Sequence, residues 1–219
     1  MPSLVGGQVI GSVLVLHDQP LGADAEGRLR ESVTQAGPIL ANLRTLARAE
    51  RRAATDALTG LPNARAVQDT LTRMAAQSAR SLTPLTAIMI DLDRFKALND
   101  DFGHEAGNDV LAAAAQALQG TLRASDFVGR YGGEEFVALL PHTDRDGGTE
   151  VGEKLRLAMT QVRAAGVERG VTASFGVASL PEDAPDGPGL LRQADRALYR
   201  AKELGRNGVE TASQPASRT

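Results

Sequence analysis

Two adjacent glycines, Gly132 and Gly133, constrain the fold of this chain more than any other feature. They separate two short runs of strand-like composition, 127–131 and 135–140, and only Glu134 stands between the glycines and the second run. Glycine readily supplies the positive φ that a tight turn needs, so the segment predicts an antiparallel β-hairpin. A hairpin combined with helical periodicity elsewhere indicates an α+β fold.

The spacing of apolar residues divides the rest of the chain into helices and strands. Helical intervals predict four helices, at 64–79, 107–122, 151–162 and 190–204. Apolar and β-branched runs predict further strands, at 8–16, 85–91 and 171–178. A polar loop is expected after Asp91, and Gly205 is expected to end the last helix.

A helix with a regular apolar stripe is expected before this domain. Its apolar residues are spaced alternately four and three apart, which is the a/d pattern of a coiled coil: Leu29, Val33, Ala36, Leu40, Leu43 and Ala47. Gly37 and Pro38 should bend or interrupt this helix. The stripe fits a single helix packed on its own domain and a parallel two-stranded coil that dimerises the protein equally well. Gly60 and Pro62 then mark a domain boundary.

Composition excludes several classes of protein. Of the 219 residues only 3% are aromatic and the formal net charge is −3, which argues against binding of single-stranded nucleic acid or of polyanions in general. The absence of cysteine excludes disulfides, thiol catalysis and thiolate metal sites. No run is long and apolar enough to span a bilayer, and the N-terminus lacks the pattern of a signal peptide, so a cytoplasmic protein without membrane contact is expected.

The strand that ends at Asp91 brings carboxylates to one place. Strand alternation puts Asp91 and Asp93 on one face, and Lys96 follows about one turn later. A buried strand that ends in a carboxylate, with a lysine nearby, suits a hydrated Mg²⁺ and a phosphate. Helix-capping residues in a solvated loop would look the same, and for an isolated pair of aspartates that explanation is the stronger one.

Two other motifs are ambiguous when each is taken alone. The glutamates at 134–135 follow glycines that would let a metal or phosphate approach the backbone, but for this motif alone an exposed hairpin with charged side chains is the stronger explanation. Lys202 and Arg206 stand one turn apart on the last helix and so share a face, but a cation-rich last turn is also the usual end of a helix.

Taken together, these motifs closely resemble those of GGDEF-domain diguanylate cyclases. The similarity runs from Asp56 (DALTGLPN) to about Asn207 (GRN), through DLDRFKALNDDFGHEAGN, RASDFVGRYGGEEF and ADRALYRAKELGRN. The resemblance implies an α+β domain with a central sheet and flanking helices, similar to the palm of nucleotidyl cyclases and polymerases. A long helix would precede it.

The resemblance also implies a metal site and catalytic roles. Mg²⁺ (or Mn²⁺) would be bound by Asp91, the backbone carbonyl of Leu92 and Glu134. Glu134 would in addition activate the attacking 3′-hydroxyl, with Glu135 as a supporting metal or ribose contact. Lys96 would offset the charge of the triphosphate.

Contacts to the substrate are implied at six positions, namely Phe95, Asn99, His104, Asn108, Lys202 and Arg206. Asn99 would face the base, while Lys202 and Arg206 would grip phosphate. The family usually has an aspartate that reads guanine where this chain has Asn108, with Asp109 next to it, so the strictness of guanine recognition is open. A smaller departure is Ala64, where arginine is common.

Arg123 and Asp126 form the RxxD motif five residues before the hairpin signature, which is the family's inhibitory site for its own product. An i,i+3 surface ion pair, worth little in stability, is the alternative.

The expected organisation is a GAF-like C-terminal remnant at 1–27, a linker helix at 28–55, the cyclase domain at 56–210 and a tail at 211–219. The resemblance implies that two copies of the chain, each holding one GTP, form cyclic di-GMP and pyrophosphate at their interface, with feedback by the product. Two alternatives remain: a catalytically silent cyclic di-GMP receptor, and a cyclase of relaxed base specificity.

Overall fold

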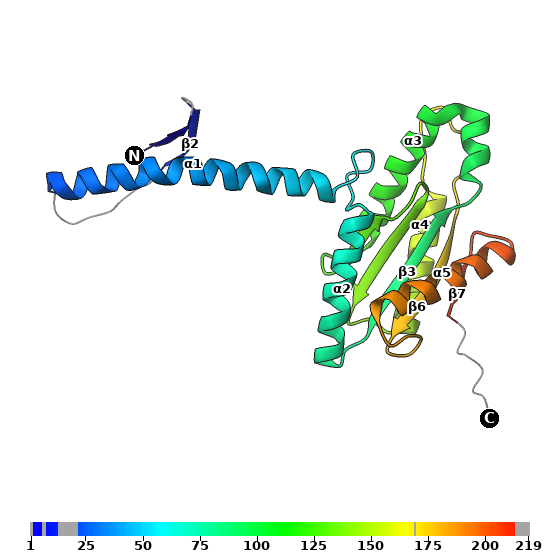
Figure 1. Cartoon of the computed structure of the whole chain (residues 1–219). Coiled ribbons are helices and arrows are strands. Elements are labelled where there is room, and N and C mark those ends of the chain that lie inside the picture. The colour runs from blue at the N-terminus through cyan, green and yellow to red at the C-terminus, as the bar shows by residue number, and fades with distance from the viewer. Residues whose placement is uncertain (1, 6–7, 13–21, 169, 213–219) are drawn as a thin grey trace. The chain divides into compact units, whose positions relative to one another are not determined.

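The computed structural model describes residues 2–5, 8–12, 22–168 and 170–212, and the chain divides into two compact units, Met1–Ala53 and Ala54–Thr219 (Figure 1). In the first unit, β1 (Pro2–Val5) pairs antiparallel with β2 (Gln8–Ser12), and α1 (Ala23–Ala54) follows. β2 confirms the first part of the strand expected at 8–16; residues 13–16 lie outside the described residues. β1 was not expected from the sequence.

Helix α1 runs without interruption through Gly37 and Pro38, so of the bend or interruption expected there, the interruption is wrong. Proline removes only one backbone donor, and the turns on either side keep their own hydrogen bonds. On the apolar stripe, Val33 is buried, whereas Leu40 and Leu43 are 47% and 55% exposed.

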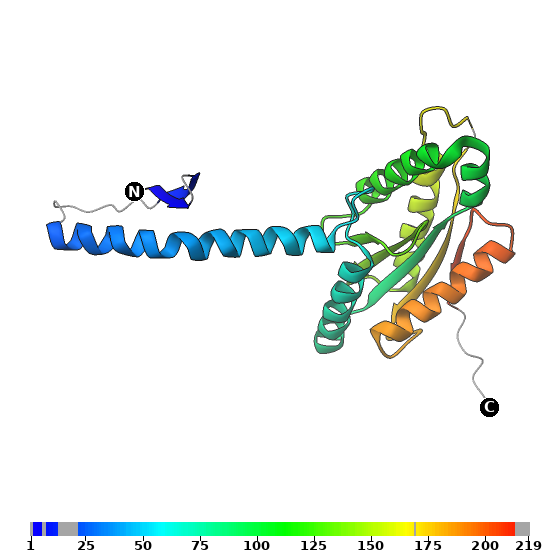
Figure 2. The ribbon, with the colours of Figure 1, turned by 45° about the horizontal axis from the view of Figure 1, so that its top comes forward.

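A five-stranded sheet in the order β4-β5-β3-β6-β7 forms the centre of the second unit (Figures 1 and 2). Its elements are α2 (Ala64–Ser81), β3 (Leu85–Leu92), α3 (Phe95–Thr121), β4 (Phe127–Arg130), β5 (Glu135–Pro141), α4 (Arg145–Thr160), β6 (Ala173–Leu180), α5 (Gly187–Glu203) and β7 (Val209–Thr211). Neighbouring strands are antiparallel except for β6 and β7, which are parallel. The expected hairpin is present as β4 and β5.

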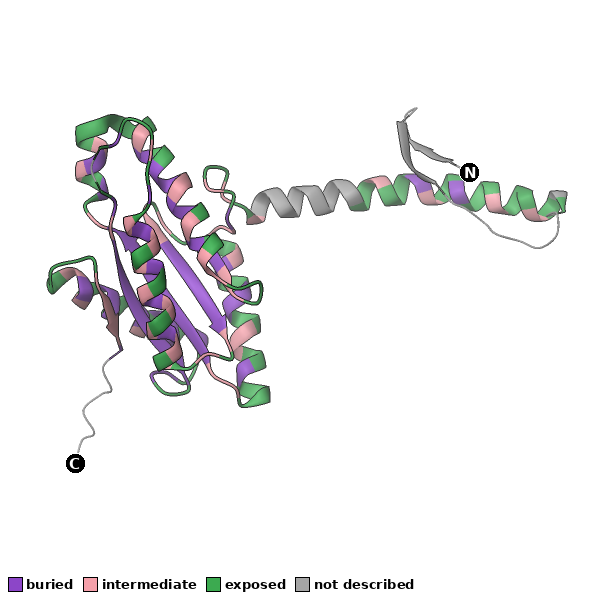
Figure 3. Ribbon diagram, turned by 180° about the vertical axis from the view of Figure 1, so that it is seen from behind, coloured by how far each residue is buried: buried purple, intermediate pink, exposed green. Residues whose placement is uncertain are grey.

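Helices cover both faces of this sheet. Helices α3 and α4 pack on the face that carries Ile88 and Ile90, and α2 and α5 pack on the face that carries Ala87 and Met89. Every residue of β3 and β6 is buried, as the purple strands of Figure 3 show. The expectation of an α+β domain with a central sheet and flanking helices is therefore confirmed.

Helix α3 differs most from the expectation. It begins at Phe95, so the polar loop expected there is in fact helical, and it changes direction at Gly103 (φ 84°, ψ 162°). Its first arm, 95–102, is anchored by Phe95 and Leu98, which are 7% and 4% exposed, while most of the polar residues of this arm are exposed. Two apolar anchors at i and i+3 therefore suffice to hold a segment that otherwise has the composition of a loop.

Other boundaries differ by a few residues. Helix α4 begins earlier than expected because Asp144 caps it, its side chain accepting from the backbone N–H of Gly147 at 2.9 Å. Helix α5 ends at Glu203, and Gly205, with φ 121°, stands just beyond it as the expected stop. Among the described residues, no helix is long and apolar enough to cross a membrane.

Candidate active site

The carboxylate of Asp91 lies at the middle of the sheet, near the end of its central strand. β3 places Asp91 opposite Glu135 of β5 on one side and opposite Ser174 of β6 on the other. The residue is only 5% exposed, and its Oδ2 lies 2.7 Å from Nζ of Lys202 in the last turn of α5. Burial raises the pKa of Asp91 above its ordinary value of 3.8 and the charge of Asp93 adds to the rise, while Lys202 and Arg206 oppose it.

Glu134 joins Asp91 from the β4–β5 turn. Its backbone carbonyl accepts a hydrogen bond from the N–H of Leu92 at 3.2 Å, so the turn is tied directly to the end of β3. Burial raises the pKa of Glu134 above 4.5, the charge of Asp91 adds to the rise, Lys202 opposes it, and Glu135 contributes a further rise. The two acids therefore lie close enough to repel each other.

This arrangement fits a divalent cation. Asp91, Glu134 and the backbone of Leu92 offer oxygen donors, which Mg²⁺ and Mn²⁺ prefer. Within the described ranges, no group of three or more His, Cys, Asp or Glu side chains could hold a metal. The candidate ligands are two side-chain carboxylates and one backbone carbonyl, so they do not form such a group. The raised pKa values of both acids, each partly caused by neighbouring negative charge, indicate a place where a cation would be stabilised.

The two glycines of the turn do not have the backbone conformation expected for them. Neither Gly132 nor Gly133 has a φ in the left-handed region, so the positive φ expected from the sequence is wrong. A Cβ on Gly132 would instead collide with the carboxylate of Glu135. Glycine at this position therefore makes room for the acidic side chain that follows.

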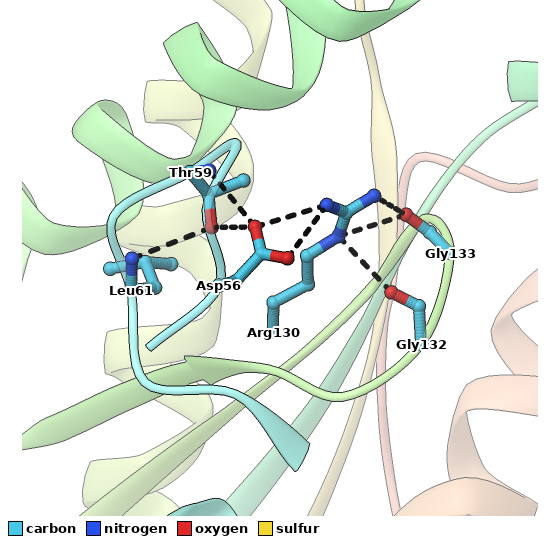
Figure 4. A network of polar contacts seen from close by, with 6 residues as sticks. All are labelled: Asp56, Thr59, Leu61, Arg130, Gly132 and Gly133. Atoms are coloured by element: carbon cyan, nitrogen blue, oxygen red, sulfur yellow. Dashed lines mark hydrogen bonds and ion pairs between the residues drawn. The ribbon is translucent and has the colours of Figure 1, made fainter. Parts of the chain in front are cut away.

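Arg130, at the end of β4, clamps the same turn from outside (Figure 4). Its NH1 lies 3.0 and 3.1 Å from the two carboxylate oxygens of Asp56, and its NH2 donates to the carbonyl of Gly133 at 2.6 Å. Its Nε donates to the carbonyls of Gly132 and Gly133, each at 3.2 Å. Asp56 is fixed in turn by the backbone and hydroxyl of Thr59, at 2.9 and 2.7 Å.

This clamp was missed from the sequence. Nothing in the local sequence around Asp56 or Arg130 indicates that the two side chains meet, because 74 residues separate them. Burial alone would raise the pKa of Asp56, but hydrogen bonds from Thr59 and Arg130 and the charge of Arg130 hold it below 3.8. Asp56 is thus ionised at neutral pH and available to orient the guanidinium.

Asp93 has a structural task. Its carboxylate accepts from the hydroxyls of Thr172 at 2.8 Å and Ser174 at 2.7 Å, and from the backbone N–H of Asn207 at 3.0 Å. It thereby ties the end of β3 to the segments that lead into β6 and β7.

The residues expected to contact substrate lie mainly along α3. Lys96, His104 and Asn108 are exposed, whereas the side chain of Phe95 packs into the hydrophobic core. Asn99 is half-buried, and its Oδ1 is buried without a hydrogen-bond partner in the described part of the chain. That oxygen is an acceptor whose donor has to come from outside.

Lys202 and Arg206 do not share a helix face as expected. Helix α5 ends at Glu203, and Arg206 follows Gly205 with its own φ of 67°, its N–H donating to the carbonyl of Ala201 at 3.0 Å. The expectation extended the helix beyond its stop. Arg206 nevertheless acts electrostatically on Asp91, as Lys202 does, so both basic side chains lie near this carboxylate.

Arg123 and Asp126 lie towards the opposite end of β5 from Glu134, just before β4. The carboxylate of Asp126 accepts from the backbone N–H of Arg123 at 3.0 Å, so the turn is held without the guanidinium. Both residues border a hollow of about 260 Å³, together with His142 and Lys154.

Comparison with known proteins agrees with this geometry. The family model described as "Diguanylate cyclase, GGDEF domain" matches residues 53–208. Diguanylate cyclase DgcP of Pseudomonas aeruginosa is 42% identical over 164 residues, which cover 74% of this chain and 24% of that protein. Response regulator PleD of Caulobacter vibrioides is 38% identical over 161 residues, covering 72% of this chain and 36% of PleD.

Solved structures give the same result. The coiled coil and GGDEF domain of DgcB from Caulobacter crescentus, in complex with c-di-GMP, has a TM-score of 0.75 at 30% identity, covering 85% of this chain and 98% of that one. The active GGEEF domain of a diguanylate cyclase from Vibrio cholerae has a TM-score of 0.66 at 33% identity, covering 70% and 98%. The chain spans only about a quarter to a third of the length of DgcP and PleD. From residue 53 to residue 208, the chain belongs to the GGDEF family of diguanylate cyclase domains.

Proposed function

We propose that this chain is a diguanylate cyclase that joins two GTP molecules into cyclic di-GMP and releases pyrophosphate. The observation that carries the proposal is the meeting of Asp91, Glu134 and Lys202 at the end of the central strand, inside a complete GGEEF turn. A damaged turn would favour a silent cyclic di-GMP receptor instead, and this turn is intact.

Asp91, Glu134 and the carbonyl of Leu92 would hold Mg²⁺ or Mn²⁺. When bound, the cation would neutralise phosphate charge and lower the pKa of the 3′-hydroxyl. Lys202, which lies 2.7 Å from Asp91, supplies the local positive charge in the structure and would turn to the phosphates when nucleotide binds.

The protein's own side chains would have separate roles in this reaction. Glu134 would accept the proton of the 3′-hydroxyl, whose oxygen attacks the α-phosphorus while the bond to pyrophosphate breaks. Lys96, Lys202 and Arg206 would stabilise the negative charge of the triphosphate. Glu135, which Gly132 accommodates, would support the metal or the ribose.

Two copies of the chain are needed, because each 3′-hydroxyl attacks the nucleotide held by the other copy. Leu40 and Leu43, exposed on an unbroken helix and spaced as in a coiled coil, support a dimer formed through the linker at 28–55. A GAF-like remnant would occupy 1–27, the cyclase domain 56–210 and a tail 211–219.

Product feedback would act through Arg123 and Asp126. The guanidinium of Arg123 makes no ion pair with Asp126 in the described structure. It is therefore available to donate two hydrogen bonds to a phosphate or to the edge of a guanine.

A cyclase of relaxed base choice is the second candidate, and Asn108 favours it. Guanine presents two adjacent donors, to which a carboxylate could offer two acceptors, whereas an amide offers one. Mixed cyclic dinucleotides are the expected products if this site is permissive.

Incubating the purified chain with Mg²⁺ and either GTP or GTP plus ATP, and then identifying the products by mass spectrometry, tests these proposals. Cyclic di-GMP is expected, and its formation should be abolished in Glu134→Gln, which keeps the shape of the side chain but removes its charge. Comparable synthesis by a folded Glu134→Gln variant would contradict the assignment. Binding of cyclic di-GMP without any synthesis by the wild type would instead favour the receptor.

A further inference from the structure

The two arms of α3 pack closely against each other at Gly107. Because the helix changes direction at Gly103, Gly107 of the second arm faces Asn99 and Phe95 of the first. A Cβ on Gly107 would collide with Oδ1 of Asn99, and it would lie 3.0 Å from Cγ of Asn99 and 3.2 Å from Cζ of Phe95.

The backbone itself does not require glycine here. Gly107 has helical geometry, unlike Gly103, and glycine weakens the interior of a helix relative to alanine. The same helix uses alanine freely, for example at Ala114 and Ala115. What a side chain at 107 would disturb is the amide of Asn99.

The position of the Asn99 amide is energetically unfavourable. Its Oδ1 is buried and accepts no hydrogen bond from any described residue, and such unsatisfied acceptors are rare in folded proteins. Guanine carries a ring N–H and an exocyclic amine, both of which could donate to this oxygen.

We infer that Gly107 is a positioning residue for base selection: it leaves the space in which Asn99 holds its carbonyl oxygen ready for guanine. The inference rests on the proposed cyclase function. Gly107 needs no contact with the nucleotide, since it acts only through Asn99.

Gly107→Ala tests this, with Gly120→Ala as the matched control. Gly120 lies on the same helix, and a Cβ there would meet no atom of the described chain within 4 Å. Gly107→Ala is expected to raise KM for GTP about tenfold, the effect of losing one hydrogen bond, with kcat little changed and competition by ATP stronger. Gly120→Ala should leave all three unchanged.

The double variant Asn99→Ala/Gly107→Ala separates positioning from a general packing defect. Once the amide is gone, the oxygen that a Cβ at 107 would collide with is absent and Cζ of Phe95, at 3.2 Å, has to give way only slightly, so the double variant should match Asn99→Ala alone in KM. If the effects of the two substitutions add in full, or if Gly107→Ala behaves like Gly120→Ala, the inference is wrong. If Gly107→Ala fails to fold, the double variant decides: it should fold, and its failure to do so would also overturn the inference.

Loss of the proposed function would be recognised separately. A wild type that makes no cyclic di-GMP would refute the cyclase proposal, and the GTP affinities of the same variants, measured by calorimetry, would then replace KM in the comparison. Equal affinities, or no binding of GTP at all, would refute the role of Gly107.

Discussion

Replacing Arg130 with alanine is expected to destabilise the domain and to misplace the turn that carries Glu134. The guanidinium joins Asp56 to the carbonyls of Gly132 and Gly133, and the two charged side chains are only 16% and 23% exposed. Without it, the carboxylate of Asp56 keeps only Thr59 as a partner among the described residues, and the two turn carbonyls lose their side-chain donor.

The magnitude follows from this partial burial. A hydrogen bond to a charged group contributes about 1.5–3 kcal/mol, whereas breaking a fully buried pair costs about 3–5 kcal/mol. The Arg130–Asp56 pair keeps some solvent, so a loss of about 2–3 kcal/mol is expected. For a domain of this size that corresponds to a fall in Tm of about 4–12 °C.

Thermal unfolding followed by circular dichroism measures this loss, with Arg156→Ala as the control. Arg156 pairs with Glu153 on α4 and also donates to the side chain of Asn207 at 3.3 Å; because Glu153 is 46% exposed, the loss of Arg156 should cost less than the loss of Arg130, about 1 kcal/mol. Arg130→Lys should recover only part of the stability, since an ammonium cannot bond in the same forked geometry.

The pH dependence adds a second test. The pKa of Asp56 in the folded state lies below 3.8, so the stabilisation is fully present above that pH and is lost as the pH falls through the folded value. The difference in Tm between wild type and Arg130→Ala should therefore become smaller below about pH 4. The reasoning would be refuted if Arg130→Ala lowered Tm no more than Arg156→Ala does. It would also be refuted if the difference in Tm between wild type and Arg130→Ala did not change with pH.

Three further outcomes are expected. Asp91→Asn should raise Tm at neutral pH, because burial raises the pKa of Asp91 and its charged form therefore costs stability there; Mg²⁺ should raise the Tm of the wild type but not of this variant, and equal rises in Tm with Mg²⁺ would contradict the metal site. Arg123→Ala should weaken inhibition by added cyclic di-GMP about tenfold or more in progress curves, whereas unchanged inhibition would reduce the motif to a surface turn. Asn108→Asp should improve kcat/KM for GTP about tenfold and sharpen exclusion of ATP, and a variant with neither change would show that Asn108 does not read the base.

The sequence predicted the hairpin and the main helices because glycine pairs and apolar spacing are local signals. It did not predict β7, which has three residues and pairs in parallel with β6, because so short a run carries no period of its own. The sequence predicts a loop where the first arm of α3 lies, since Phe95 and Leu98 are its only buried apolar anchors among the described residues and stand among polar side chains.

The candidate site was predicted through the family resemblance more than through any local pattern. Asp91 and Glu134 are far apart in sequence, and only the pairing of β3 with β5 brings them together. The partnership of Arg130 with Asp56 and the collision that excludes a side chain at Gly107 are likewise non-local. Periodicity has no means of indicating contacts of this kind.

The position of β3 between β5 and β6 has a consequence for synthesis on the ribosome. β6 ends only at Leu180, and the helix that carries Lys202 emerges later still. Strand pairings across such long separations form slowly and late, so a nascent chain that already displays Asp91 and Glu134 still lacks one neighbour of its central strand. Under the proposed function, nucleotide turnover would have to wait for translation of nearly the whole domain, and a chain stalled before α5 would be silent.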